Sequence, residues 1–220
     1  MTEFHDVVRR RRMTRAFDRR PVPAELLDEL VELGSRAPSA GKTQGWHLVL
    51  LEGEETARFW DITLPPMRRG AFRWKRLLDA PVIALPLADP RAYTDRYSET
   101  DKQATGLGVS TDAWPAPYWT VDASMSVMTM LLAAEAVGLG ALFFGVFKGE
   151  RQLRRALGIP PSMQLLGALA IGYPAAQDET PARGSAPSSG DDTSPGSPGQ
   201  SAGRRRRGPE EIIHRGGWRV

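Results

Sequence analysis

The fold of this chain is decided by two stretches, Arg11-Arg12-Met13-Thr14-Arg15-Ala16-Phe17 and Ala37-Pro38-Ser39-Ala40-Gly41-Lys42-Thr43-Gln44-Gly45-Trp46. The first stretch places three arginines beside an aromatic residue. The second is a turn of small residues that runs into the apolar residues 48–51. Guanidinium groups bind phosphate oxygens well, and glycine lets a backbone approach a flat ligand closely. Together the two stretches predict a binding site for an aromatic cofactor that carries a phosphate.

Composition fits one globular domain with a hydrophobic core. The chain has 220 residues, of which 41% are hydrophobic and 25% are charged. The formal net charge of +3 is modest, but arginines gather at residues 9–12 and 204–207. Such clusters attract the phosphate of a nucleotide cofactor, of a nucleic acid or of a membrane surface. The charge alone therefore leaves three kinds of partner open.

Several kinds of chemistry are excluded by what the sequence lacks. Cysteine is absent, so the chain has no disulfide, thiolate nucleophile or cysteine metal site. The three histidines, His5, His47 and His214, are isolated from one another, and we expect no metal site. The first residues lack the basic and then apolar pattern of a secretory signal, so we expect a cytoplasmic protein.

Hydrophobic periodicity and turn residues predict alternating helices and strands. We expect helices at 4–12, from Pro23 to the turn at Pro38, 54–62, 67–78, 121–137 and 151–157, and strands at 47–52, 80–88, 141–147 and 165–173. Residues 89–118 read as a long irregular region, which in a compact domain is usually functional or a lid. At its C-terminal end, Trp114, Tyr118 and the adjoining Trp119 either line a substrate pocket or pack the loop in place.

The apolar stretch 123–147 has the length of a membrane span but not its continuity. It carries one charge, Glu135, and is interrupted by Gly138-Leu139-Gly140. A buried helix, a glycine turn and a buried strand explain the stretch better, and we expect no membrane partner.

Composition changes abruptly after Pro174. Residues 175–203 contain no Leu, Ile, Val, Met or aromatic residue, and such a segment cannot bury enough apolar surface to order itself. We therefore predict a domain at 1–174, a disordered linker at 175–203 and a C-terminal arm at 204–220, anchored through Ile212, Ile213 and Trp218.

Two nucleotide-binding motifs are only partly present. Gly41-Lys42-Thr43 matches the end of a phosphate-binding P-loop, but Arg36 stands where that motif needs its first glycine. Gly138 and Gly140 match part of a dinucleotide fingerprint, but here the glycines follow a helix and precede a strand, the reverse of the required order. Neither motif predicts a nucleotide site.

The two opening stretches resemble the first and second signatures of the FMN-dependent nitroreductase family. The resemblance continues through Gly138-Leu139-Gly140, the residues 142–145 and the residues 169–174, and it ends with Arg205 to Arg207, the run 210–214 and Trp218. Several matching segments in the order that the family has them, spread over residues 11–218, are more specific than any one segment. The resemblance implies an α+β fold, with a mostly antiparallel sheet flanked by helices, in a domain-swapped homodimer with one FMN in each of two interface clefts.

The resemblance also implies which residues bind FMN. Arg11 and Arg12 would hold the phosphate, and Arg15 would lie near the pyrimidine edge of the flavin. Pro38, Ser39, Ala40 and Gly41 would pack beside the ring from the partner chain, with Gln44 near them. The backbone at Phe144 and Gly145 would lie next to the reactive nitrogen, and Arg205 and Arg207 would close over the phosphate. Met13 lies in the same stretch and is included among the cofactor-binding residues; Trp46 and Phe17 are assigned to the core.

Four positions depart from the family pattern. Met13 stands where Ser is frequent, Lys42 where Asn is common, Gly45 where Pro is common, and Phe144 where some members have an acidic residue. These changes keep FMN as the expected cofactor and leave the substrate pocket open. A relative that uses a deazaflavin stays an alternative.

The resemblance implies an oxidoreductase. NAD(P)H would pass a hydride to the flavin, and an electron-poor small molecule such as a nitroaromatic or a quinone would then be reduced. No protein nucleophile is needed, in agreement with the absence of cysteine. The alternatives are a flavin- or deazaflavin-binding module without reductase activity, and nucleic-acid binding through the arginine runs, which we do not expect.

Overall fold

The computed structural model describes residues 3–176 and 205–218. The helices are α1 (Phe4–Arg10), α2 (Ala24–Ser35), α3 (Thr56–Thr63), α4 (Pro66–Arg69), α5 (Pro90–Tyr97), α6 (Tyr118–Ala136), α7 (Glu150–Ala156) and α8 (Pro209–Ile212). Single 3-10 turns are η1 (Ala40–Lys42), η2 (Gly53–Glu55), η3 (Lys75–Asp79), η4 (Gln103–Thr105) and η5 (Thr111–Ala113). The strands are β1 (Trp46–Glu52), β2 (Val82–Ala88), β3 (Gly140–Phe144), β4 (Gln164–Leu165) and β5 (Ala168–Gly172).

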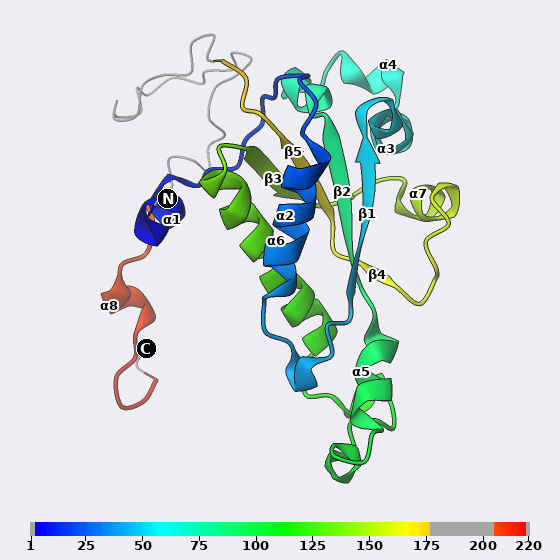
Figure 1. The fold of residues 1–220 in the computed structure, drawn as a ribbon, viewed down its shortest axis with the longest axis vertical. Coiled ribbons are helices and arrows are strands. Elements are labelled where there is room, and N and C mark those ends of the chain that lie inside the picture. The colour runs from blue at the N-terminus through cyan, green and yellow to red at the C-terminus, as the bar shows by residue number, and fades with distance from the viewer. Residues whose placement is uncertain (1–2, 177–204, 219–220) are drawn as a thin grey trace. The chain divides into compact units, whose positions relative to one another are not determined.

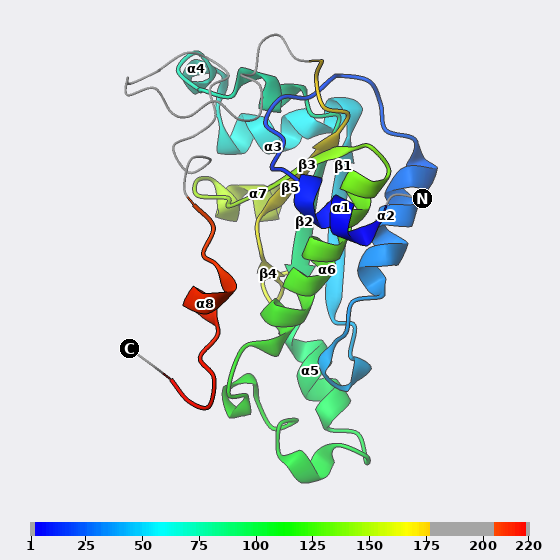
Figure 2. The ribbon, with the colours of Figure 1, turned by 90° about the vertical axis from the view of Figure 1, so that its left-hand side faces the viewer.

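The strands form one sheet in the order β1-β2-β5-β3, and β4 also pairs with β2. Every pair of strands is antiparallel. Helices cover both faces: α2 and α6 pack together on one face, and α3 and α7 lie on the other (Figures 1 and 2). The predicted α+β fold with a mostly antiparallel sheet flanked by helices is confirmed.

Strand β2 is buried along its whole length because both of its faces are covered. Val82 and Ala84 belong to the core cluster that contains α2 and α6 residues. Ile83, Leu85 and Leu87 alternate with them and belong to the cluster on the side of α3. Side chains alternate between the two faces of a strand, so an uninterrupted apolar run is what a strand between two helical layers requires.

Four predicted elements differ from the structure. Residues 67–78 do not form one helix: α4 ends before Gly70, and the chain resumes at η3. The region 89–118 is not irregular throughout, since α5 occupies its first part. The predicted strand 165–173 is divided into β4 and β5, and the predicted strand 141–147 ends at Phe144.

Helix α6 occupies the apolar stretch that matched a membrane span in length. Asp122 and Ser126 are buried within it, and Val121 and Met128 are 42% and 43% exposed. Within residues 3–176 and 205–218, none of the helices has the length and apolar character that a bilayer span requires. The helix packs mainly on α2 and on the sheet.

The segment that carries the first stretch lies along the edge of the sheet, beside β3. Met13 forms a parallel bridge with Ala141, and the Thr14 amide donates to the Ala141 carbonyl at 3.0 Å. Phe17 pairs with Pro174 and is fully buried, which confirms its assignment to the core. The arginines of this stretch are thereby fixed next to β3.

Replacing Gly140 by Ala is expected to destabilise the fold by about 1–3 kcal/mol, because the new methyl group would overlap the side chain of Thr14 in the segment beside β3. A Cβ atom at Gly140 would lie 2.6 Å from the Thr14 Oγ1 and 2.8 Å from its other side-chain carbons. Chemical denaturation measures the change. The matched control is Gly70→Ala, whose Cβ would enter open space, and adding Thr14→Gly to Gly140→Ala should recover part of the loss. Equal stability of Gly140→Ala and Gly70→Ala would contradict the close packing.

The C-terminal residues 205–218 are described by themselves. They contain α8, which begins with Pro209 after Gly208, and the rings of His214 and Trp218 stack at 4.1 Å. The predicted linker falls outside the described residues from 177 onward.

Candidate cofactor site

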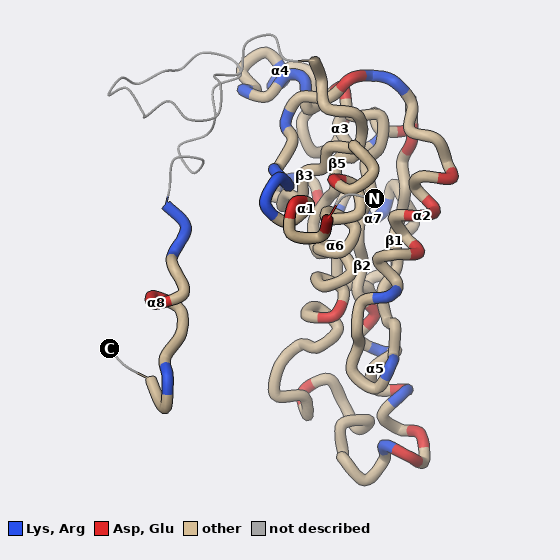
Figure 3. The backbone as a smooth tube through the Cα atoms, turned by 60° about the vertical axis from the view of Figure 1, so that its left-hand side comes forward, with Lys and Arg blue, Asp and Glu red and all other residues tan. Residues whose placement is uncertain are grey.

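The first candidate residue, Arg11, holds a buried nitrogen atom without a hydrogen-bond partner. Its Nη1 has less than 1 Å² of accessible surface and finds no partner among the described residues. The residue follows the last turn of α1, where Lys and Arg gather in the tube drawing (Figure 3). A buried cationic donor without a partner costs free energy, so its retention here points to an anionic ligand.

The other two arginines of this stretch already have protein partners. Arg12 Nη1 donates to the carbonyls of Arg9, Arg10 and Arg11 at 2.6, 3.2 and 3.0 Å, so it caps the end of α1. Arg15 Nη1 donates to the Met13 carbonyl at 3.2 Å. The phosphate role of Arg12 and the flavin role of Arg15 remain predictions.

Strand β3 connects this stretch to the predicted residues Phe144 and Gly145. Met13 pairs at the start of β3 and Phe144 ends it three residues after Ala141, a distance of about 10 Å along a strand. The Phe144 ring stacks on Trp60 at 6.0 Å with an interplanar angle of 6°. The Phe144 ring therefore packs against the core, and the role of the backbone at Phe144 and Gly145 beside a flavin stays a prediction.

Two residues that the sequence did not single out lie beside the arginine stretch. The Arg15 Cζ is 5.3 Å from the centre of the Trp74 ring. The Arg76 backbone carbonyl accepts a hydrogen bond from the Phe17 amide at 3.1 Å, and the Arg76 Nη2 donates to the Phe17 carbonyl at 3.3 Å. The basic and aromatic composition of residues 67–78 could have indicated these two residues, but predicting one helix there gave no reason to place them beside the arginine stretch.

The second stretch forms a tight loop at the start of β1. Ser39 Oγ accepts a hydrogen bond from the Gln44 amide at 3.0 Å, which closes the loop. Pro38 and Gln44 are exposed, while Ser39, Ala40 and Gly41 are half-buried. We name residues 38–44 the small-residue loop.

The small-residue loop and the arginine stretch lie at opposite ends of the sheet within one chain. Cross-strand pairing through β5 and β2 places Ala141 of β3 in one row with Glu52, the last residue of β1. The small-residue loop leads into Trp46, the first residue of β1, six positions before Glu52. At about 3.3 Å per residue these rows are roughly 20 Å apart along the strands.

The aromatic residues of the region 89–118 pin that region. Trp114 is 8% exposed, and its Nε1 donates to the Leu107 carbonyl at 2.9 Å. Its ring contacts Tyr93 at 5.7 Å and Tyr97 at 4.6 Å between centroids. The sequence left two roles open for these aromatic residues, lining a substrate pocket or packing the loop in place. Trp114 has the packing role, whereas Tyr118 is 38% exposed.

The C-terminal arginines have a carboxylate partner within their own segment. Arg205 Nη1 lies 2.6 Å from the Glu211 Oε1, and Arg207 donates to the Glu211 carbonyl. The Arg205 guanidinium lowers the pKa of the Glu211 carboxyl. A phosphate bound by Arg205 would have to replace this carboxylate, and the role of both arginines stays a prediction.

The described residues also define what the site does not contain. Over residues 3–176 and 205–218, no three His, Asp or Glu side chains lie together as they would around a metal ion.

Comparison with known proteins identifies the family. The model of the nitroreductase family matches residues 8–173. The chain belongs to the nitroreductase family. It is 31% identical to an NADH dehydrogenase of Thermus thermophilus over 76% of this chain and 84% of that protein. It is 26% identical to the 4-nitrobenzoate reductase of Nocardioides sp. over 79% of this chain and 81% of that protein.

Solved structures share the fold of this family member. A protein of Exiguobacterium sibiricum, solved in complex with FMN, superposes with a TM-score of 0.64 at 19% identity, covering 83% of this chain and 92% of that one. A nitroreductase family protein of Clostridium novyi gives a TM-score of 0.61 at 18% identity, covering 79% and 86%. The predicted family and the class of nitroreductase-type oxidoreductases are confirmed.

Proposed function

We propose that this nitroreductase family member binds FMN and passes reducing equivalents from NAD(P)H to an electron-poor small molecule such as a nitroaromatic or a quinone. The observation that carries the proposal is the buried Nη1 of Arg11, which has no hydrogen-bond partner within residues 3–176 and 205–218. Family membership supports it, as does the FMN complex of the structural neighbour from Exiguobacterium sibiricum.

The residues present fit an aromatic cofactor with a phosphate. Arg11 offers an unused donor to phosphate oxygens, and guanidinium donors suit that geometry. Arg15 places a positive charge beside the half-buried Trp74, where it favours a ligand that gains negative charge. Gly145 already lets an aromatic ring lie against the backbone, since a Cβ there would be only 2.8 Å from the ring of Phe147, which is 93% exposed.

FMN, when bound, supplies the redox chemistry of two-electron transfer. NAD(P)H would lose a hydride in the first half-reaction, and the acceptor would gain the two electrons with protons in the second. The chain contributes binding, orientation and charge. Its lack of cysteine agrees with a reaction that needs no protein thiolate.

The separation of the arginine stretch from the small-residue loop supports a homodimer. The arginine stretch and the small-residue loop are roughly 20 Å apart along the sheet of one chain, so one FMN can contact both only between two copies. Val121 and Met128, seven residues apart on α6, leave apolar surface for a second copy to cover. The partner that we propose is therefore a second copy of this chain.

An absorbance spectrum of the purified protein tests the function. We expect a yellow flavoprotein, or uptake of about one FMN per chain on titration, and rapid bleaching by NADH or NADPH under anaerobic conditions. Adding a nitroaromatic or a quinone should restore the colour. Colourless protein that takes up no FMN would refute the proposal, and bound flavin that neither nucleotide bleaches would support the binding module without reductase activity.

A further inference from the structure

The small-residue loop holds an unfavourable backbone shape. Gly41, Lys42 and Gln44 have φ values of 60°, 56° and 54°, and the last two residues carry side chains. Residues other than glycine rarely adopt such values because the Cβ atom crowds the backbone. A loop of this shape persists only where its surroundings hold it.

A buried carboxylate holds the inner side of the loop. Asp122, on α6, is 5% exposed. Its Oδ2 accepts one hydrogen bond from the Ala40 amide and another from the Tyr93 hydroxyl, both at 2.8 Å. Burial and the Asp122 carboxylate raise the pKa of Tyr93, so the phenol stays protonated and keeps donating. The carboxylate thus ties the loop to α6 and α5 together.

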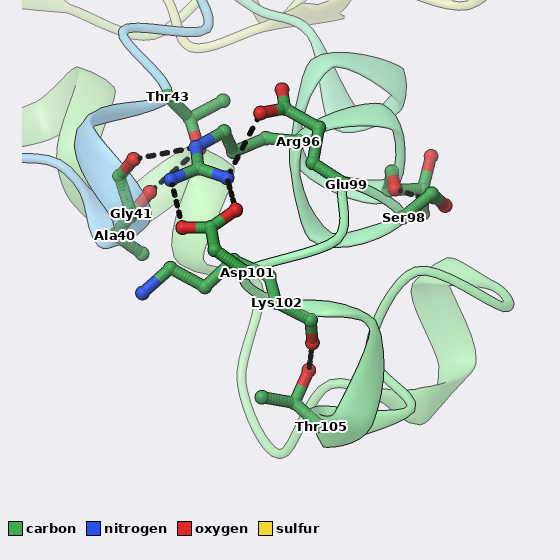
Figure 4. Close-up of polar contacts among 10 residues, drawn as sticks. Ala40, Gly41, Thr43, Arg96, Ser98, Glu99, Asp101, Lys102 and Thr105 are labelled. Carbon is green, nitrogen blue, oxygen red and sulfur yellow. Dashed lines mark hydrogen bonds and ion pairs between the residues drawn. The ribbon is translucent and has the colours of Figure 1, made fainter.

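An arginine holds the outer side of the loop (Figure 4). Arg96, on α5, donates from Nε to the Gly41 carbonyl at 3.0 Å. Its Nη1 and Nη2 donate to the two carboxylate oxygens of Asp101 at 2.7 and 2.8 Å, in a forked pair. Such forked pairs fix a guanidinium group in direction as well as in position.

Aromatic packing completes this support. A Cβ atom at Gly41 would lie 2.9 Å from the Tyr97 ring, so the loop backbone rests directly on that ring. Tyr97 and Tyr93 both contact the buried Trp114. The region 89–118 is therefore joined to the loop by hydrogen bonds and by packing.

We propose that Arg96 and Asp122 are positioning residues that hold the small-residue loop in the shape that contacts FMN bound by the arginine stretch of the partner copy. Region 89–118 then acts as a fixed brace for the cofactor site of the other subunit rather than as a lid over its own. This inference rests on the proposed function, and it adds the residues that prepare the loop.

The first test is FMN affinity of Arg96→Gln, measured by quenching of flavin fluorescence with the full-length protein. Loss of a hydrogen bond from a charged donor should raise the dissociation constant about tenfold. The matched control is Arg36→Gln, which removes the same charge two residues before the loop from an exposed ion pair with Glu32. Arg96→Lys keeps the positive charge but loses the forked pair with Asp101. Its dissociation constant for FMN should lie between those of the wild type and Arg96→Gln, and it is the second variant to measure if Arg96→Gln does not fold.

A mixed dimer separates positioning from general destabilisation. One subunit carries Arg96→Gln, the other carries Arg11→Ala, and two different affinity tags isolate the mixed species. If the loop serves the partner's FMN, one site combines the intact Arg11 of the first subunit with the intact loop of the second. One site of wild-type affinity per dimer is then expected. If Arg96→Gln acts within its own subunit, both sites are defective.

The outcomes are distinguishable from failure of the proposed function. Wild-type protein that binds no FMN would refute the function itself. Wild-type protein that binds FMN while Arg96→Gln binds it equally tightly would overturn only the positioning role, as would a mixed dimer without a normal site.

Discussion

Arg11→Ala is expected to weaken FMN binding about 100-fold or more without lowering the stability of the FMN-free protein. Removing one partner of a buried charge interaction costs a complex about 2–5 kcal/mol. In the FMN-free chain the Arg11 Nη1 is buried and has no partner among the described residues, so its removal there relieves a cost. Fluorescence titration measures the affinity, and thermal unfolding without FMN measures the stability.

Arg12→Ala is the matched control for this result. Arg12 Nη1 donates to three carbonyls at the end of α1, so its loss should lower the thermal midpoint and change the affinity less. The opposite pattern, in which Arg12→Ala abolishes binding and Arg11→Ala preserves it, would show that the phosphate is bound elsewhere than at the buried nitrogen.

Phe17→Ala is expected to destabilise the fold by about 3–5 kcal/mol, which is a large share of the roughly 5–15 kcal/mol by which a native protein is stable. Phe17 is fully buried in the cluster that contains Leu51, Phe59 and Leu142. Its backbone also joins Arg76 and Pro174, so the cavity opens where the arginine stretch is attached to the sheet.

Chemical denaturation with a purified, FMN-free sample measures this loss. Phe17→Leu keeps most of the volume and should cost less than about 1.5 kcal/mol. Phe147→Ala removes the same ring from a side chain that is 93% exposed and should change stability by less than about 0.5 kcal/mol. A loss for Phe17→Ala as small as that for Phe147→Ala would contradict its place in the core.

The elements with strong hydrophobic patterns could be predicted from sequence. Hydrophobic periodicity correctly placed helices α2 and α6 and strands β1 and β2. The pattern is strong in these elements because they bury apolar side chains in the core. The α5 helix was missed although Asp89 and Pro90 signal its start. The Asp89 carboxylate accepts the Arg91 amide at 2.9 Å, and Pro90 fits the first helical position.

The prediction of one helix at 67–78 was wrong for a different reason. Its composition suits a helix, but α4 ends at Arg69, and Trp74, with φ −98° and ψ 67°, departs from helical geometry. Trp74 then lies beside Arg15, 59 positions earlier in the sequence. Local propensity is a weak guide where contacts with distant residues decide the backbone.

By itself the sequence determined the family and the helices and strands with strong periodicity, and it supplied the candidate residues of a cofactor site, because hydrophobic period and arginine, glycine and proline placement are local properties. Tertiary structure decided which of those residues already have partners in the protein. Arg11 and Arg12 are neighbours with the same side chain, yet a nitrogen of Arg11 is buried with no partner in the described part of the chain, whereas a nitrogen of Arg12 caps α1. It also joined Arg96 and Asp122 to the small-residue loop, 55 and 82 positions away, since burial and hydrogen bonding depend on contacts that no local pattern records.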